Sequence, residues 1–212
     1  NPEILVLDEP TAMLDPQGRA DIMHILDELQ QHGTTIILVT HHRDEFVNAD
    51  RIIRLDNGRI VQSARGNTAS IPEMDESGTA QEDNPIAKSN IANGASKPTS
   101  AVPIIEIHNL IYQYPNSSNP VLDKLSITIN EGETVAITGH NGAGKTTLAR
   151  LLCALEQPQS GSITVNTIPV ARQRANGNMQ SLKRADREKL RATIGYVMQH
   201  PERQLFAETV AE

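Results

Sequence analysis

The sequence has almost no aromatic residues: Trp is absent, and Phe and Tyr together account for 2% of its 212 residues. A core built from such a chain must be aliphatic, as in the buried parallel sheets of α/β proteins. The single cysteine, Cys153, excludes an intramolecular disulfide and fits a reducing compartment. The longest apolar runs, such as Ile36 to Val39, are far shorter than the roughly 18 residues that cross a bilayer. The sequence therefore predicts no transmembrane segment of its own.

Basic residues are also fewer than acidic residues in this sequence. The chain has 19 Lys and Arg against 26 Asp and Glu, a net charge of −7, which argues against a nucleic-acid partner. The basic stretch from 172 to 191 is best interpreted as a solvated helix face, with contact to anionic lipid or nucleic acid as the alternative. No signal segment opens the chain, which starts inside an apolar run at Asn1, so we expect a piece of a longer protein.

Composition divides the chain into three parts. Residues 1–61 and 102–212 alternate short β-like runs with amphipathic helices, which indicates an α/β fold. Residues 62–101 contain no Leu, Phe or other aromatic residue and are rich in Ser, Asn, Ala, Gly and Pro. Such a segment buries too little apolar area to offset its ordering entropy, so it is predicted to be a flexible linker.

Local signals in the first part are clear. Asp15 and Pro16 predict a helix start, apolar residues at helical spacing follow, and Gly33 predicts the stop. Buried strands are expected at 4–7 and 36–39, and Asn57-Gly58 predicts a β-hairpin. In the third part we expect strands at 104–112, 125–129, 133–138, 162–165 and 193–198. One helix is expected from a leucine-rich face that includes Leu155, and a second helix is expected at about 181–191.

The strongest single motif is a phosphate-binding loop that follows the apolar strand at 133–138. Residues 139–146 match the pattern G-x-x-x-x-G-K-[ST], whose glycines let successive backbone N–H groups converge on phosphate oxygens. Lys145 is expected to reach the β- and γ-phosphates, and the Thr146 hydroxyl to bind Mg²⁺. The cofactor-binding residues predicted here are Gly139, Asn141, Gly142, Ala143, Gly144, Lys145, Thr146 and Thr147.

Acidic and imidazole side chains follow two further strands. Asp8 and Glu9 end the first strand, where ligands bind in open α/β sheets, so Asp8 is a candidate for Mg²⁺ through water and Glu9 for polarising the attacking water. His41 follows the strand at 36–39, and its neighbour His42 is expected to point away from it. An exposed acid pair and an ordinary histidine are common at strand ends, so these residues alone do not identify a site.

Taken together, the motifs resemble the ATPase domains of ABC transporters. Asp8 and Glu9 resemble the end of the Walker B strand, Asp15 the D-loop and His41 the switch histidine of one domain. From Ile104 the chain resembles the start of a second domain. There Tyr114 matches the adenine-stacking aromatic, 139–147 the Walker A loop, and Gln199 the Q-loop glutamine that also binds Mg²⁺. The run 199–210 is similar to the energy-coupling-factor branch, which takes up vitamins and metal ions.

The resemblance implies a RecA-like P-loop fold with a mixed sheet and flanking helices, lacking the family's helical lobe and its Leu-Ser-Gly-Gly-Gln signature. It implies the end of one domain (1–61), a linker and the start of another (102–212). In a longer parent, Lys145 and Glu9 then belong to different ATP sites. Each part supplies strands that the other lacks, so within this chain the two are expected to associate, bringing Glu9, His41 and Lys145 into one pocket.

The function implied is ATP hydrolysis, with Mg²⁺, at the cytoplasmic face of a bacterial membrane. Expected partners are transmembrane transporter subunits and a second ATPase domain, with Glu9 and His41 as catalytic residues. Two alternatives stay open. A tandem ABC protein that acts on ribosomes usually has a charged helical linker, unlike 62–101. A nucleotide-binding fragment without turnover fits the missing signature.

Overall fold

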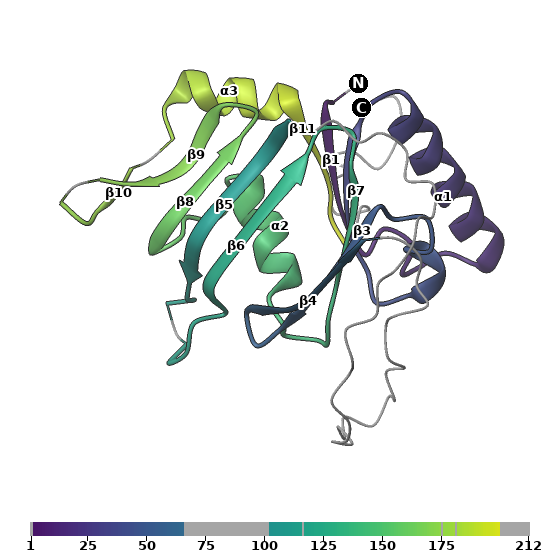
Figure 1. The fold of residues 1–212 in the computed structure, drawn as a ribbon, viewed down its shortest axis with the longest axis horizontal. Coiled ribbons are helices and arrows are strands. Elements are labelled where there is room, and N and C mark those ends of the chain that lie inside the picture. Colours follow the sequence, from purple (N-terminus) through teal and green to yellow (C-terminus); the bar gives the residue numbers. More distant parts are fainter. Residues whose placement is uncertain (1, 66–101, 116, 175, 181, 200–212) are drawn as a thin grey trace, which may run out of the picture.

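The computed structural model describes residues 2–65, 102–115, 117–174, 176–180 and 182–199. The described residues form a six-stranded mixed sheet and a five-stranded antiparallel sheet, with helix α2 between them and helix α1 on the outer side of the larger sheet (Figure 1). The predicted α/β fold with a mixed sheet and flanking helices is confirmed. The predicted linker lies outside the described residues, apart from 62–65. No helix in the described ranges has the length and apolar character needed to cross a bilayer.

Both halves of the chain contribute strands to the six-stranded sheet. Strand β7 lies between β2 and β3 and is parallel to both, and β11 is parallel to β1 at one edge. The expected association of the two parts is therefore confirmed in this chain. The strands, in spatial order, are β11 (Ile194–Val197), β1 (Ile4–Asp8), β2 (Thr35–Val39), β7 (Thr134–Thr138), β3 (Arg51–Asp56) and β4 (Arg59–Arg65).

Local sequence explains the elements of the first part. Asp15 caps helix α1 (Pro16–Gln31) by accepting a 2.8 Å hydrogen bond from the Gly18 N–H, as predicted. Asn57 and Gly58 both have positive φ, +45° and +74°, as a type I′ hairpin requires. Strand β4 continues to Arg65, beyond the predicted boundary at 61, because its polar residues pair through their backbone with β3.

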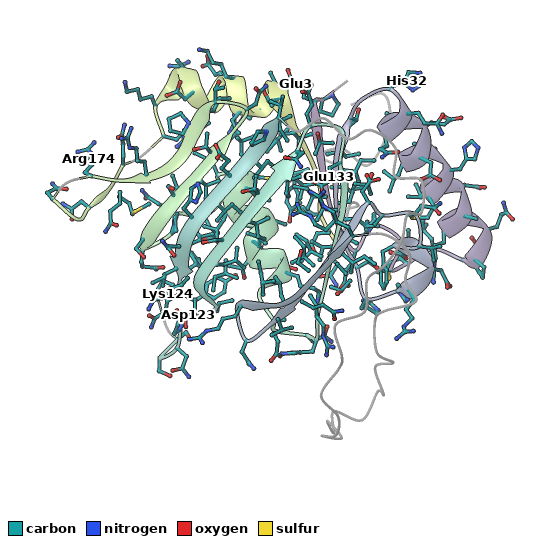
Figure 2. All side chains as sticks on the ribbon, in the orientation of Figure 1. Glu3, His32, Asp123, Lys124, Glu133 and Arg174 are labelled. Atoms are coloured by element: carbon teal, nitrogen blue, oxygen red, sulfur yellow. The ribbon has the colours of Figure 1, made fainter. Side chains whose placement is uncertain are left out.

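The five-stranded sheet comes entirely from the second part of the chain. Its strands, in spatial order, are β10 (Met179–Gln180), β9 (Ile168–Gln173), β8 (Ser160–Val165), β5 (Pro103–Tyr112) and β6 (Leu122–Asn130). Strands β9 and β10 were not predicted, and they lead into helix α3 (Arg184–Thr193). In Figure 2, Arg174 lies at the far end of this sheet and His32 at the end of α1, on opposite sides of the molecule.

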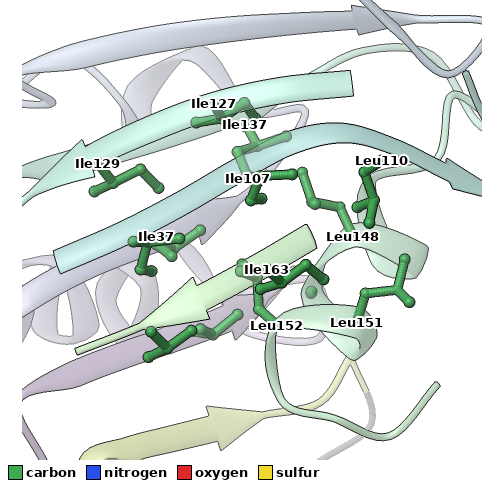
Figure 3. Close-up of a cluster of buried hydrophobic side chains, with 14 of the residues drawn as sticks. Ile37, Ile107, Leu110, Ile127, Ile129, Ile137, Leu148, Leu151, Leu152 and Ile163 are labelled. Carbon is green, nitrogen blue, oxygen red and sulfur yellow. The ribbon is translucent and has the colours of Figure 1, made fainter. Parts of the chain in front are cut away.

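The main core fills the space between the two sheets around α2 (Lys145–Leu152). Aliphatic side chains from both sheets, among them Ile37 and Ile107, pack with Leu148 and Leu152 (Figure 3). A smaller cluster packs α1 against the opposite face of the larger sheet. Leu155, predicted on the helix face, lies beyond the end of α2 and is 58% exposed, so that prediction is wrong. Since the chain has few aromatics, branched aliphatic side chains do this packing.

Buried polar contacts also join the two parts of the chain. The Arg51 guanidinium on β3 lies 2.9 Å from the Glu133 carboxylate, measured from Nε to Oε1, just before β7. Its Nη2 also donates to the Thr128 carbonyl at 2.5 Å. Asp50 accepts the Thr134 N–H at 2.8 Å. Glu133 lies near the middle of the molecule in Figure 2, so these contacts fix the register of β7 against β3 from within.

Candidate functional site

The candidate site lies where four parallel strands of the larger sheet reach their carboxyl ends. Asp8 is the last residue of β1, His41 follows β2 by two residues, Gly139 follows β7 directly, and Gln199 follows β11 by two residues. Because these strands are parallel, their carboxyl ends share one edge of the sheet. Residues far apart in the sequence therefore meet at this edge.

A cavity of about 480 Å³ opens at this edge. It is lined by residues from both parts of the chain: Glu9, His41, Tyr114, Val121, Asn141, Gly142, Gly144, Lys145, Thr146, Thr147 and Gln199. The predicted convergence of Glu9, His41 and Lys145 in one pocket is therefore observed. Gly139, Ala143 and Asp8 were also predicted site residues, but they lie outside the lining.

The loop from Gly139 to Gly144 curls ahead of helix α2, which begins at Lys145. Gly139 has φ +148°, and a Cβ there would lie 2.3 Å from the Leu55 carbonyl oxygen on β3. Only glycine fits this approach. The Gly58 N–H of the β3–β4 hairpin donates to the Ala143 carbonyl at 3.2 Å. Gly139 and Ala143 thus shape the loop against the first part of the chain, which explains why they do not face the cavity.

Lys145 is folded onto the loop that precedes it. Its Nζ donates to the carbonyls of Gly139 at 2.9 Å and His140 at 3.1 Å, and the residue is buried. Burial lowers the pKa of the Lys145 ammonium, while the negative charges of Glu9 and Asp8 act in the opposite direction. A cation held among carbonyls beside the free N–H groups of a helix start is a site that an oxyanion such as phosphate completes.

Asp8 and Thr146 bring two oxygen ligands together. The Thr146 hydroxyl donates to Asp8 Oδ1 at 3.1 Å, and Asp8 is 1% exposed. Desolvation raises the pKa of the Asp8 carboxyl, although the Thr146 hydrogen bond and the nearby cations Arg150 and Lys145 partly oppose it. A carboxylate beside a hydroxyl is a hard-oxygen donor set, so these residues fit a magnesium ion.

The Glu9 carboxylate is held between two side chains at the cavity. His41 Nδ1 lies 3.3 Å from Glu9 Oε1, and Gln199 Nε2 donates to Glu9 Oε2 at 2.8 Å. The Glu9 side chain is 14% exposed and that of His41 is 49% exposed. A carboxylate aimed into a cavity next to an imidazole has the chemistry of a base for a bound water.

The remaining predictions have mixed outcomes. Tyr114 lines the cavity, and its hydroxyl is 3.1 Å from Thr147 Oγ1, while its ring packs edge-on against Tyr112. His42 was expected to point away from His41, but the ring centroids are only 4.1 Å apart. That expectation is wrong because the chain leaves strand geometry after Val39, so the side chains no longer alternate.

Sequence reasoning missed two contacts at the site. His140 Nε2 lies 2.8 Å from Asp56 Oδ1, which ties the phosphate loop to the end of β3. Val121, ahead of β6, supplies apolar lining to the same cavity as Tyr114. His140 stands at a variable position of the phosphate-loop motif, and Val121 belongs to no motif. The Asn57-Gly58 hairpin beside Asp56 was visible in the sequence, but its position under the loop depends on β7 entering between β2 and β3.

Comparison with known proteins agrees with this geometry. Residues 122–212 match the family model described as ABC transporter. A Bifidobacterium longum protein named as an ABC transporter ATP-binding protein is 45% identical over 238 aligned residues, covering 100% of this chain and 30% of its own length. Proteins with the same description from Methanosarcina acetivorans (29% identical; 100% of this chain, 40% of the relative) and Methanosarcina mazei (32%; 98% and 38%) also match.

The chain thus spans between 30% and 40% of the length of these three relatives. The similarity extends over both parts of the chain and not only over the phosphate-binding loop, since the alignments cover 98% of it or more. Together with the P-loop geometry, these matches show that the chain belongs to the ABC transporter ATP-binding protein family.

Proposed function

We propose that this chain is part of an ATP-hydrolysing subunit of an ABC importer of the energy-coupling-factor type, which powers uptake of a vitamin, a metal ion or a similar solute. The observation that carries the proposal is that Lys145 and Thr146 line one cavity with Glu9 and His41. The Thr146 hydroxyl also donates to the buried Asp8 carboxylate behind it. The importer branch is supported by the sequence run 199–210. The proposed partners are transmembrane subunits and a second ATPase domain, at the cytoplasmic face of the membrane.

Different residues at the cavity would bind the different parts of ATP and Mg²⁺. The N–H groups of the loop and the Lys145 ammonium would hold the β- and γ-phosphates, and Tyr114 would stack on adenine. Thr146 and Gln199, with Asp8 through water, would hold Mg²⁺, which neutralises phosphate charge when bound. Glu9 Oε1 or Oε2 would accept a proton from water, and His41 would orient Glu9 and contact the γ-phosphate.

In the proposed tandem arrangement, the residues of this cavity serve two ATP sites of a longer protein. Residues 1–61 would end one ATPase domain, and residues 102–212 would begin the next, so Glu9 and Lys145 would each act with the matching part of their own domain. The size of the relatives supports this view, since the chain covers 30% to 41% of the first five of them. In the 212-residue chain, β7 pairs with both β2 and β3. The two half-domains therefore have complementary strand edges.

The test is nucleotide binding by the 212-residue chain. Calorimetric titration with Mg-ATP should show binding, and Lys145→Ala should weaken it about tenfold or more, because a charge-assisted contact to phosphate is lost. Lys189→Ala, which removes the same charge from an exposed position on α3, is the matched control and should bind like the unmodified chain. Equal affinity of the Lys145 variant and the control would reject the phosphate-site assignment.

A second candidate, nucleotide binding without turnover, is favoured by one sequence observation: no Leu-Ser-Gly-Gly-Gln-like signature occurs in the 212 residues. In the family, this signature comes from a facing domain and completes the hydrolytic site. The chain alone should then bind Mg-ATP but release phosphate at the rate of a protein-free blank. Turnover above the blank that disappears in Glu9→Gln would instead favour a hydrolytic site within this chain.

A further inference from the structure

A carboxylate that belongs to none of the recognised motifs is buried directly behind the site. Glu45 closes the short 3-10 helix η1 (Arg43–Glu45), which follows β2, and its side chain is 1% exposed. A buried carboxylate is costly unless hydrogen bonds compensate for its lost hydration. Its partners therefore indicate why it is there.

Two buried threonines donate to this carboxylate from two different loops. The Thr11 hydroxyl, from the turn after β1, donates to Glu45 Oε1. The Thr40 hydroxyl, directly after β2, donates to Oε2 at 2.5 Å and also accepts the His42 N–H at 3.0 Å. Both threonines are 0% exposed. Arg19 of helix α1 lies 3.8 Å from Oε1 and provides a compensating positive charge.

The two loops joined in this way carry Glu9 and His41. Thr11 is two residues after Glu9, and Thr40 immediately precedes His41. Glu9 has φ +49°, a left-handed conformation that costs free energy in residues with a side chain and persists only where neighbours impose it. The Glu9 N–H is fixed to the Val39 carbonyl at 2.9 Å, and the Glu9 carbonyl accepts the Ala12 N–H at 3.2 Å.

We propose that Glu45 is a positioning residue: by holding Thr11 and Thr40 together, it maintains the left-handed Glu9 backbone and the Glu9–His41 contact. Glu45 does not line the cavity, so it acts through these two loops rather than on the nucleotide. The proposal rests on the proposed function in one respect only, namely that Glu9 and His41 face the γ-phosphate. The buried contacts themselves do not depend on it.

The binding test separates positioning from general stability. Glu45→Ala, Glu45→Gln and Thr40→Val are compared with Asp44→Asn, a control that removes a carboxylate from the exposed neighbouring position of η1. If Glu9 and His41 are displaced, Mg-ATP affinity should fall about tenfold in Glu45→Ala, while Mg-ADP affinity changes less than about twofold. Glu45→Gln keeps one acceptor and should restore much of the difference, and Thr40→Val should show a smaller loss. Equal loss of both nucleotides, or no loss, would overturn the proposal.

A second measurement keeps the proposal testable if no nucleotide binds or if Glu45→Ala does not fold. In spectra of the nucleotide-free chain, the Glu9 amide and the His41 ring signals should move in Thr40→Val and Glu45→Gln and stay in place in Asp44→Asn. Unmoved Glu9 and His41 signals in these variants would refute the positioning role. Failure of Lys145→Ala to weaken Mg-ATP binding would refute only the phosphate-site assignment.

Discussion

The ion pair between Arg51 and Glu133 offers a quantitative test of the shared sheet. Glu133 accepts from Arg51 Nη2 at 3.2 Å and from the Asn130 N–H at 2.9 Å, and the two charged side chains are 14% and 3% exposed. Burial lowers the pKa of Arg51, and the negative charge of Glu133 opposes this effect. The charged form of the guanidinium is therefore stabilised by Glu133. Removing one member of a buried pair leaves an uncompensated charge.

Glu133→Gln should therefore lower the free energy of unfolding by about 3 kcal/mol, the lower end of the range for breaking buried pairs, because Arg51 retains some contact with water. For a chain of this size the melting temperature should fall by roughly 6 to 12 °C. Adding Arg51→Met removes the uncompensated positive charge, so the double variant should recover part of the lost free energy of unfolding. The double-mutant cycle should give a coupling energy on the order of 2 kcal/mol.

The assay is urea unfolding followed by circular dichroism, with Glu188→Gln as the control. Glu188 pairs with Arg184 on the surface of α3, at side-chain exposures of 66% and 95%, so its loss should change stability by less than about 0.5 kcal/mol. A coupling energy near zero would mean that β3 and the start of β7 do not meet in solution. The description of one sheet built from both parts would then be wrong.

Two further predictions follow from buried titratable groups. Because burial raises the pKa of Asp8 above its ordinary 3.8, the folded state binds the proton more tightly, and its stability falls as pH rises through the folded pKa. Asp8→Asn should therefore unfold at higher urea than the unmodified chain at pH 7 but not below pH 3.8; a less stable variant at pH 7 would contradict this. Burial also raises the pKa of Cys153 to about 12, so alkylation at pH 8 should be at least about 100-fold slower in the native chain than in urea. Comparable labelling rates would show that the core around α2 is open.

Much of the site was predictable because its chemistry depends on local sequence. The phosphate loop, the cap at Asp15 and the apolar runs of β1 and β2 each carry their signal within a few residues. Asp8, Glu9 and His41 each follow an apolar strand run. Because such strands are expected to be parallel, the sequence predicts that these residues share one edge of the sheet. Complementary strand content suggested that the two parts would pair, and the register of β7 against β2 and β3 confirms it.

The remaining features depend on tertiary context. Strand β9 contains Pro169, and β10 has only two residues, so neither produces a clear alternating pattern. Glu45 looks like part of an ordinary charged run in the sequence. Only the fold shows that its carboxylate turns inward to two threonines, one of them 34 residues away. Leu155 continued the helical spacing of α2 in sequence, but the helix ends before it, at Leu152.

The position of β7 has a consequence for refolding of the 212-residue chain. Strands β2 and β3 are complete by residue 56, yet the strand that separates them ends only at residue 138. The connection of roughly 80 residues must close before β7 can enter, and its closure costs conformational entropy. Until β7 enters, two apolar strand edges lack their neighbour, and unpaired edges of this kind promote aggregation. Aggregation of the denatured chain should therefore compete with this one step of refolding.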